Sequence, residues 1–144
     1  MTCIHRAAGA GVVLALVLGL SVPAAAQPAA AYKNGSEFYL AYRMAFDKAT
    51  SIDELLPWVA KGRAAQIAKA PPGERKDAFE MIKMFDDRTN VRVIKETPSA
   101  SGAELQVEGI SAESKGKATG VITLVKEGGA WKIERESWKG GAGQ

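Results

Sequence analysis

The chain has 144 residues, of which 47% are apolar and 24% charged, with one Cys, one His and a formal net charge of +3. This length leaves room for one domain, and the apolar share is too high for a disordered chain. The composition therefore excludes a large multi-domain enzyme, a fibrous protein and a small fold held by disulfides.

Residues 1–26 have the pattern of a secretory signal peptide. Arg6 supplies the positive charge, an apolar run follows over 10–20, and small residues precede a predicted cleavage between Ala26 and Gln27. The apolar run is about 11 residues long, whereas a membrane span needs about 20. The sequence therefore predicts an exported protein, periplasmic or secreted, without a stable membrane anchor after cleavage.

Cleavage would remove the only Cys and the only His of the chain, Cys3 and His5, and leave a formal net charge of +2. Cys3 lies before the apolar run, so it is not placed for lipid attachment. Loss of both residue types excludes a Cys nucleophile, a Ser-His-Asp triad and a Cys/His zinc site. Lysines alternate with acids along the chain, a pattern that does not favour nucleic-acid binding. No catalytic residue, metal ligand or cofactor is predicted.

Apolar residues at helical spacing dominate the chain up to residue 86. Residues 27–35 lack this periodicity and are predicted to be a disordered lead-in, followed by Ser36 as an N-cap. Helices are predicted over 37–49, 64–70 and 74–86. A further short helix, capped by Ser51, is predicted to include Ile52 to Val59. In the last helix Met81 and Met84 are expected to belong to the core.

After Asn90 the apolar period changes to two, which is typical of strands. Strands are predicted over 91–97, 103–108, 117–127 and 130–138. Gly128-Gly129 joins the last two, because both positions of a tight hairpin turn favour glycine. The domain is therefore expected to span 36–138, with a flexible tail over 139–144.

A two-residue hairpin loop fixes which side chains share a face of the sheet. Counting from the turn places Trp131, Ile133 and Arg135 on the core face, and Trp138 on the opposite, outer face. A buried guanidinium needs a carboxylate, water or a pocket beside it. Arg135 is therefore either an internal structural residue or a ligand-binding one.

Helices followed by a four-stranded antiparallel meander predict an α+β fold, with the N-terminal helices packed on one face of a curved sheet. Three segments within 36–138 resemble small exported domains of the nuclear-transport-factor-2-like family, which has the cystatin-like roll: Y-L-A-Y-R-M-A-F, D-E-L-L-P-W and V-K-E-G-G-A-W-K-I-E-R-E-S-W. The resemblance implies a conical pocket between helices and sheet. The family includes isomerases, hydratases, polyketide cyclases and members without known activity, so the fold does not select a function.

Enzymes of this family often use an Asp or a His-Asp pair in the pocket. Here His is absent from the predicted domain, and its aspartates fall on predicted helix caps or solvent-facing helix positions: Asp47, Asp53, Asp77, Asp86 and Asp87. An active member would have to use Tyr39 or Tyr42 together with a Glu.

Three functions remain open. The first is a non-enzymatic exported domain that binds an envelope protein or a small ligand, which includes anionic ligands, with Arg135, Tyr42 and Trp131 as candidate ligand-binding residues. The second is an acid–base isomerase or cyclase in which Tyr42 donates a hydrogen bond to an oxyanion. The third is a homodimerising subunit that uses Trp138 as an exposed anchor.

Overall fold

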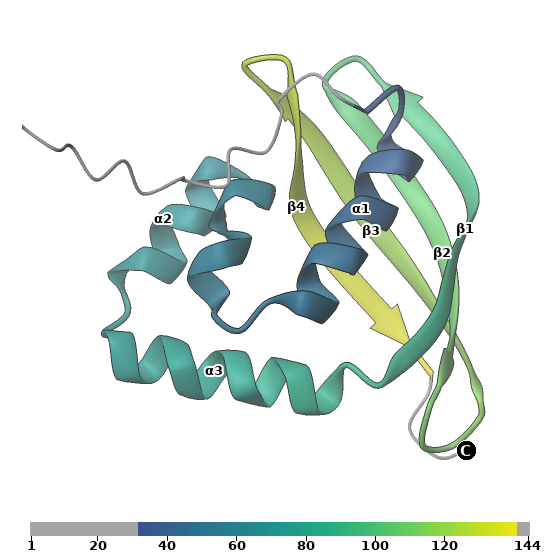
Figure 1. Cartoon of the computed structure of the whole chain (residues 1–144). Coiled ribbons are helices and arrows are strands. Elements are labelled where there is room, and N and C mark those ends of the chain that lie inside the picture. The colour runs from purple at the N-terminus through teal and green to yellow at the C-terminus, as the bar shows by residue number, and fades with distance from the viewer. Residues whose placement is uncertain (1–31, 141–144) are drawn as a thin grey trace, which may run out of the picture.

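Helices form the first half of the described chain and strands form the second half (Figure 1). The computed structural model describes residues 32–140. Its elements are α1 (Gly35–Lys48), the 3-10 helix η1 (Ile52–Trp58), α2 (Lys61–Lys69), α3 (Pro72–Phe85), β1 (Arg88–Ser99), β2 (Gly102–Ser111), β3 (Lys117–Glu127) and β4 (Ala130–Lys139). The predicted signal peptide, and the parts of the predicted lead-in and tail in 1–31 and 141–144, lie outside the described residues.

The strands form one antiparallel sheet in the order β1-β2-β3-β4. The sheet is curved and does not close, and α1 lies on its concave face (Figure 1). The other three helices, η1, α2 and α3, lie on the same side of the sheet as α1. This arrangement confirms the predicted α+β class and the meander.

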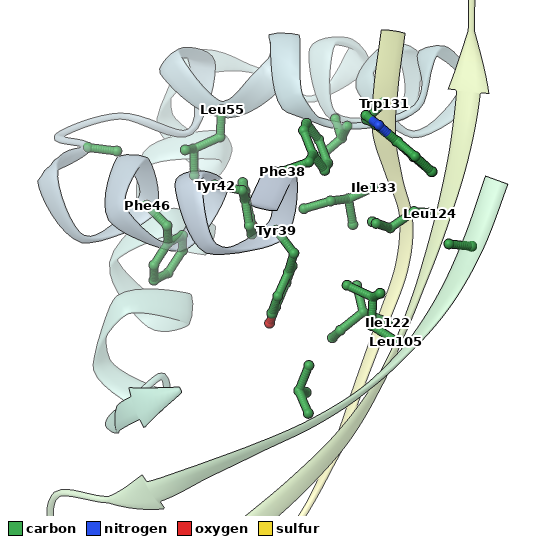
Figure 2. Close-up of a cluster of buried hydrophobic side chains, with 14 of the residues drawn as sticks. Phe38, Tyr39, Tyr42, Phe46, Leu55, Leu105, Ile122, Leu124, Trp131 and Ile133 are labelled. Carbon is green, nitrogen blue, oxygen red and sulfur yellow. The ribbon is translucent and has the colours of Figure 1, made fainter. Parts of the chain in front are cut away.

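The core lies between α1 and the concave face of the sheet. Phe38 and Tyr39 on α1 are fully buried, and Figure 2 shows them facing side chains of the sheet. Those sheet side chains alternate along β2, β3 and β4, as the period of a half-buried strand requires, and include Leu105, Ile122, Leu124 and Ile133. Trp131 is also buried, which confirms its predicted place in the core.

The start of α1 differs from the prediction. Asn34, not Ser36, is the N-cap, and its side chain accepts a hydrogen bond of 2.8 Å from the Glu37 amide. Ser36 instead donates its hydroxyl to Glu96 on β1, and that carboxylate also accepts from the amides of Gly35 and Ser36, both at 3.0 Å. A strand carboxylate thus satisfies two free amides of the helix and complements the positive end of its dipole.

Glu96→Gln should lower the free energy of unfolding by about 1 kcal/mol, because a neutral amide cannot interact with the helix dipole and accepts fewer of these bonds. Urea titration followed by circular dichroism measures the change. Glu104→Gln on β2 is the control, since Glu104 is exposed. Equal losses in the two variants would contradict this role of Glu96.

The packed region begins before residue 36. The Tyr32 ring lies 5.6 Å from Phe38 in an edge-on contact and 6.3 Å from Trp58. The predicted disordered lead-in is therefore wrong for residues 32–35, because Tyr32 covers an aromatic cluster of α1 and η1. At the other end, Lys139 still belongs to β4.

Helix α3 buries less than its periodicity predicts. Phe79 is buried, but Met81 and Met84 are 56% and 73% exposed, so their predicted place in the core is wrong. The helix contacts the rest of the fold through a narrow side, where Lys83 donates to the carbonyls of Phe46 and Asp47 at the end of α1. Much of the apolar face that the sequence shows therefore has no neighbour within the described chain.

A β-bulge changes the register of the last hairpin. Leu124 pairs with Ile133 as predicted, but Thr123 pairs with Arg135, which leaves Glu134 as an extra residue. The residues beyond the bulge exchange faces. The predicted inward position of Arg135 is therefore wrong: its side chain is exposed, and Glu136, the next residue, turns inward.

Trp138 lies beyond the same bulge and is half-buried against the core, so its predicted place on the outer face is also wrong. It pairs with Gly120, where a Cβ atom would lie only 2.8 Å from the indole ring. Glycine thus leaves the space that the Trp138 ring occupies. The basis for Trp138 as an exposed dimer anchor is removed.

Candidate functional site

A carboxylate of the sheet meets two tyrosines of α1 inside the fold. Tyr39 and Tyr42 lie three residues apart, so both face the sheet from one side of the helix. The Tyr39 hydroxyl donates to Glu136 Oε1 at 3.0 Å, and the Tyr42 hydroxyl donates to Glu136 Oε2 at 3.2 Å. The inward turn of Glu136 after the bulge is what brings these three groups together.

The two tyrosines stay protonated over the physiological range. Burial first, and then the negative charge of Glu136, raises the pKa of Tyr39 far above its ordinary value. The same two causes raise the pKa of Tyr42, and the positive charge of Arg63 opposes that rise. Each hydroxyl has one proton and donates it to Glu136, so in this arrangement Tyr42 has none to offer to an oxyanion.

A second polar group lies where α3 passes into β1. Arg43 of α1 and Asp86 form an ion pair of 2.5 Å, and Arg88 Nε reaches the other carboxylate oxygen at 2.9 Å. Burial would raise the pKa of Asp86, but the hydrogen bond and charge of Arg43, helped by Arg88, hold it below its ordinary value. For Arg43, Asp86 likewise outweighs the effect of burial and raises the pKa. Both guanidinium groups are thus committed to Asp86.

A cavity of about 210 Å³ lies beside these groups. Its apolar walls come mainly from the helices and include Phe46, Ile52, Leu55, Val59, Ile67, Phe79, Ile82 and the Trp138 ring. Its polar lining consists of Tyr42, Arg63, Asp86, Arg88 and Glu136. Other hollows, such as the one lined by Ile94 and Val121 on the sheet, lack a comparable set of buried aromatic and charged groups.

Two of the charged groups in the cavity wall form no ion pair within residues 32–140. Asp86 and Arg88 pair with each other, and the Arg88 guanidinium also lies 4.7 Å above the Trp138 ring. Within the described part of the chain, Glu136 accepts hydrogen bonds from the two tyrosine hydroxyls alone. Arg63 on α2 is half-buried and forms no hydrogen bond or ion pair with any residue in the described part of the chain. Glu136 and Arg63 are therefore the groups best placed to bind a ligand.

Of the three ligand-binding residues predicted from the sequence, only Tyr42 lines this cavity. Trp131 is buried in the core near the β3–β4 turn and has the Lys126 ammonium 4.5 Å above its ring. Arg135 is exposed on the other face of the sheet. Asp86, predicted to lie at a helix cap or a solvent-facing helix position, is the C-cap of α3, and its side chain turns inward to Arg43.

Glu136, Arg63 and Arg88 are site residues that the sequence does not predict. A regular hairpin register places Glu136, the neighbour of Arg135, on the outer face, and nothing in the residues around Glu134 marks a bulge. The one usable indication was the requirement that Tyr39 or Tyr42 act with a Glu. In the structure, both tyrosine hydroxyls donate to Glu136.

Within residues 32–140, no group of three His, Cys, Asp or Glu side chains is placed to hold a metal ion. No helix in the same range is long and apolar enough to cross a membrane. The polar groups that line the cavity are the carboxylates of Asp86 and Glu136, the guanidinium groups of Arg63 and Arg88, and the Tyr42 hydroxyl.

No protein-family model, curated protein or solved structure matches this chain. The resemblance to nuclear-transport-factor-2-like domains stays a prediction, and so does everything that it implies about activity.

Proposed function

We propose that this protein is an exported, non-enzymatic domain that binds a small, mostly apolar molecule in the cavity between α1, η1, α2, α3 and β4. The observation that carries the proposal is the combination of apolar helical walls with two charged groups, Arg63 and Glu136, that form no ion pair among the described residues. Apolar walls with a few fixed polar groups are typical of ligand sites. The volume of about 210 Å³ lies below the roughly 300–1,000 Å³ of drug-sized pockets, so the ligand is small.

Binding accounts for the tyrosines better than catalysis does. Their raised pKa values keep both hydroxyls as fixed donors, and their protons hold Glu136 in place. A general acid or base works best when its pKa lies near the operating pH. Tyr39 and Tyr42 therefore support a preorganised carboxylate rather than proton transfer of their own.

The proposal is tested with indole as an apolar probe and backbone amide NMR as the readout. Indole should shift the amide signals of residues that line the cavity, and Ile67→Trp should abolish those shifts because the larger side chain fills the cavity. Met84→Trp is the matched control, since Met84 is exposed on α3 and does not line the cavity. Shifts centred elsewhere, or equal in the two variants, would contradict the proposal.

An acid–base enzyme is the second candidate, because a tyrosine and a carboxylate do converge at the cavity. In that function Glu136 would be the base and would remove a proton next to a carbonyl group. Phenylacetone in D₂O provides a direct test, since catalysed exchange of its α-protons is followed by NMR. Exchange by the wild type that disappears in Glu136→Gln would favour the enzyme over the binding domain.

A further inference from the structure

We propose that the ligand of the cavity is an apolar hydroxy acid, whose carboxylate binds Arg63 and whose hydroxyl donates to Glu136. The inference rests on the proposed binding function and adds the chemical class of the ligand. It follows from the charges in the cavity wall, from the hydrogen bonds that Glu136 leaves open, and from the aromatic side chains around them.

The lining of the cavity has two guanidinium groups, Arg63 and Arg88, and two carboxylates, Asp86 and Glu136. Arg88 shares Asp86 with Arg43, which lies beside the cavity. Arg63 has no ion-pair partner among residues 32–140, so a ligand with a single negative charge would supply one.

Arg63 is the group that would bind this negative charge. The other two guanidinium groups already hold Asp86, whereas Arg63 has no acceptor among residues 32–140. Arg63 lines the cavity together with Tyr42, and its positive charge opposes the rise in the pKa of the Tyr42 hydroxyl. A guanidinium binds a carboxylate through two parallel hydrogen bonds, which favours an organic acid over a neutral acceptor.

The Glu136 carboxylate can accept a further hydrogen bond from a donor on the same ligand. A carboxylate has room for about four hydrogen bonds, and the two tyrosines use two of them. An acid without a hydrogen-bond donor would bring a second negative charge close to Glu136 without forming a hydrogen bond to it. A hydroxyl would satisfy Glu136 without adding a positive charge.

The apolar part of the ligand faces aromatic walls. Phe46, Phe79 and Trp138 all line the cavity, and the Trp138 ring is already covered on one face by Arg88. A phenyl or branched aliphatic group suits such walls. These features together define a small monoanion with one donor and one apolar group.

Four probes with the same phenyl group separate the contributions of the carboxylate and of the hydrogen-bond donor to the affinity. They are 3-phenyllactate, 3-phenylpropionate, phenylalanine and 3-phenyl-1-propanol. Calorimetry should give an affinity for 3-phenyllactate about tenfold higher than for 3-phenylpropionate, the size expected for one hydrogen bond to a charged group. Phenylalanine and the alcohol should both bind more weakly than 3-phenyllactate. A higher affinity for phenylalanine would overturn the inference, because it would require a cationic donor.

Two variants assign the contacts. Arg63→Met should remove the preference for the acids over the alcohol, whereas Arg135→Met, which removes an exposed guanidinium on the other face of the sheet, should leave it unchanged. Glu136→Gln should reduce the preference for the hydroxyl to about threefold, because a neutral acceptor forms a weaker bond. Circular dichroism shows whether each variant is folded.

The inference is overturned if acids bind equally well to wild type and Arg63→Met, or if the hydroxyl gives no gain in affinity. Indole distinguishes the two levels of failure. If indole still binds in the cavity, only the ligand class is wrong. If neither indole nor any of the four phenyl probes binds, the proposed function itself is wrong.

Discussion

Phe38→Ala should lower the free energy of unfolding by about 3–5 kcal/mol, the usual cost of truncating a fully buried aromatic side chain. Phe38 is 0% exposed and lies at the centre of an aromatic cluster, 5.6 Å from the Tyr32 ring and 5.7 Å from the Trp58 ring. Alanine would leave a cavity among rings from the chain before α1, from α1 and from η1. Because small domains are stable by only about 5–15 kcal/mol, this loss would be a large part of the total.

Urea titration followed by tryptophan fluorescence and circular dichroism measures the effect. Phe85→Ala is the matched control: it removes the same side chain from α3, but Phe85 is 71% exposed. We expect the control to change stability by no more than about 0.5 kcal/mol. Similar losses in the two variants would show that the α1–η1 cluster is not packed as described.

Features with a local cause could be predicted from the sequence. Alternating apolar residues define β2 and β3, and Gly128-Gly129 marks the turn between β3 and β4, where both glycines have positive φ. Trp131 lies close to this turn, so its buried position follows from a short count of residues. The order of helices and strands then gives the α+β class.

Features that depend on distant partners could not be predicted. Glu136 meets tyrosines that lie 94 and 97 residues earlier in the chain, and Arg43 finds its acceptor 43 residues later. Within α1, local spacing instead suggests Asp47 as the partner of Arg43. In the tertiary fold Arg43 turns inward and pairs with Asp86 instead of Asp47.

The bulge at Glu134 has the largest consequence for the site. A single extra residue exchanges the faces of all residues that follow it in β4, so Arg135 moves outward and Glu136 inward. The bulge lies next to Ile133, whose carbonyl accepts the Ala60 amide from the start of α2. The hydrogen bond that joins the helical segment to the edge of the sheet thus lies where the register changes. Neither this hydrogen bond nor the bulge could be predicted from residues 130–138 alone.

Asp86→Asn should lower the free energy of unfolding by about 3 kcal/mol at neutral pH, the lower end of the cost of breaking a buried ion pair. The side chains of Asp86 and Arg43 are 7% and 9% exposed, so the variant would leave the Arg43 charge buried beside a neutral amide. Asn keeps one acceptor oxygen, which is why we expect the lower value.

Asp47→Asn is the control, since Asp47 is exposed on α1 one turn from Arg43 but does not pair with it. It should cost no more than about 0.5 kcal/mol. Adding Arg43→Met to Asp86→Asn should recover part of the loss, because it removes the buried charge that the single variant leaves without a partner. Additive losses in the double variant would show that the two side chains do not interact.

The pH dependence of the same variant tests the charge of Asp86 directly. Its pKa is lower in the folded state than the ordinary value of 3.8, so ionised Asp86 stabilises the fold above pH 3.8, and this stabilisation is lost as the pH falls through the lower, folded-state pKa. Protonated Asp has nearly the shape of Asn, so the difference in unfolding free energy between wild type and Asp86→Asn should be constant near pH 7 and shrink toward zero in acid. Other carboxylates with lowered pKa values, such as Glu96 and Glu108, affect both proteins equally and cancel in this difference. Urea titrations at pH 3, 4, 5 and 7 measure it, and a difference that stays constant across this series would show that Asp86 does not act through its charge.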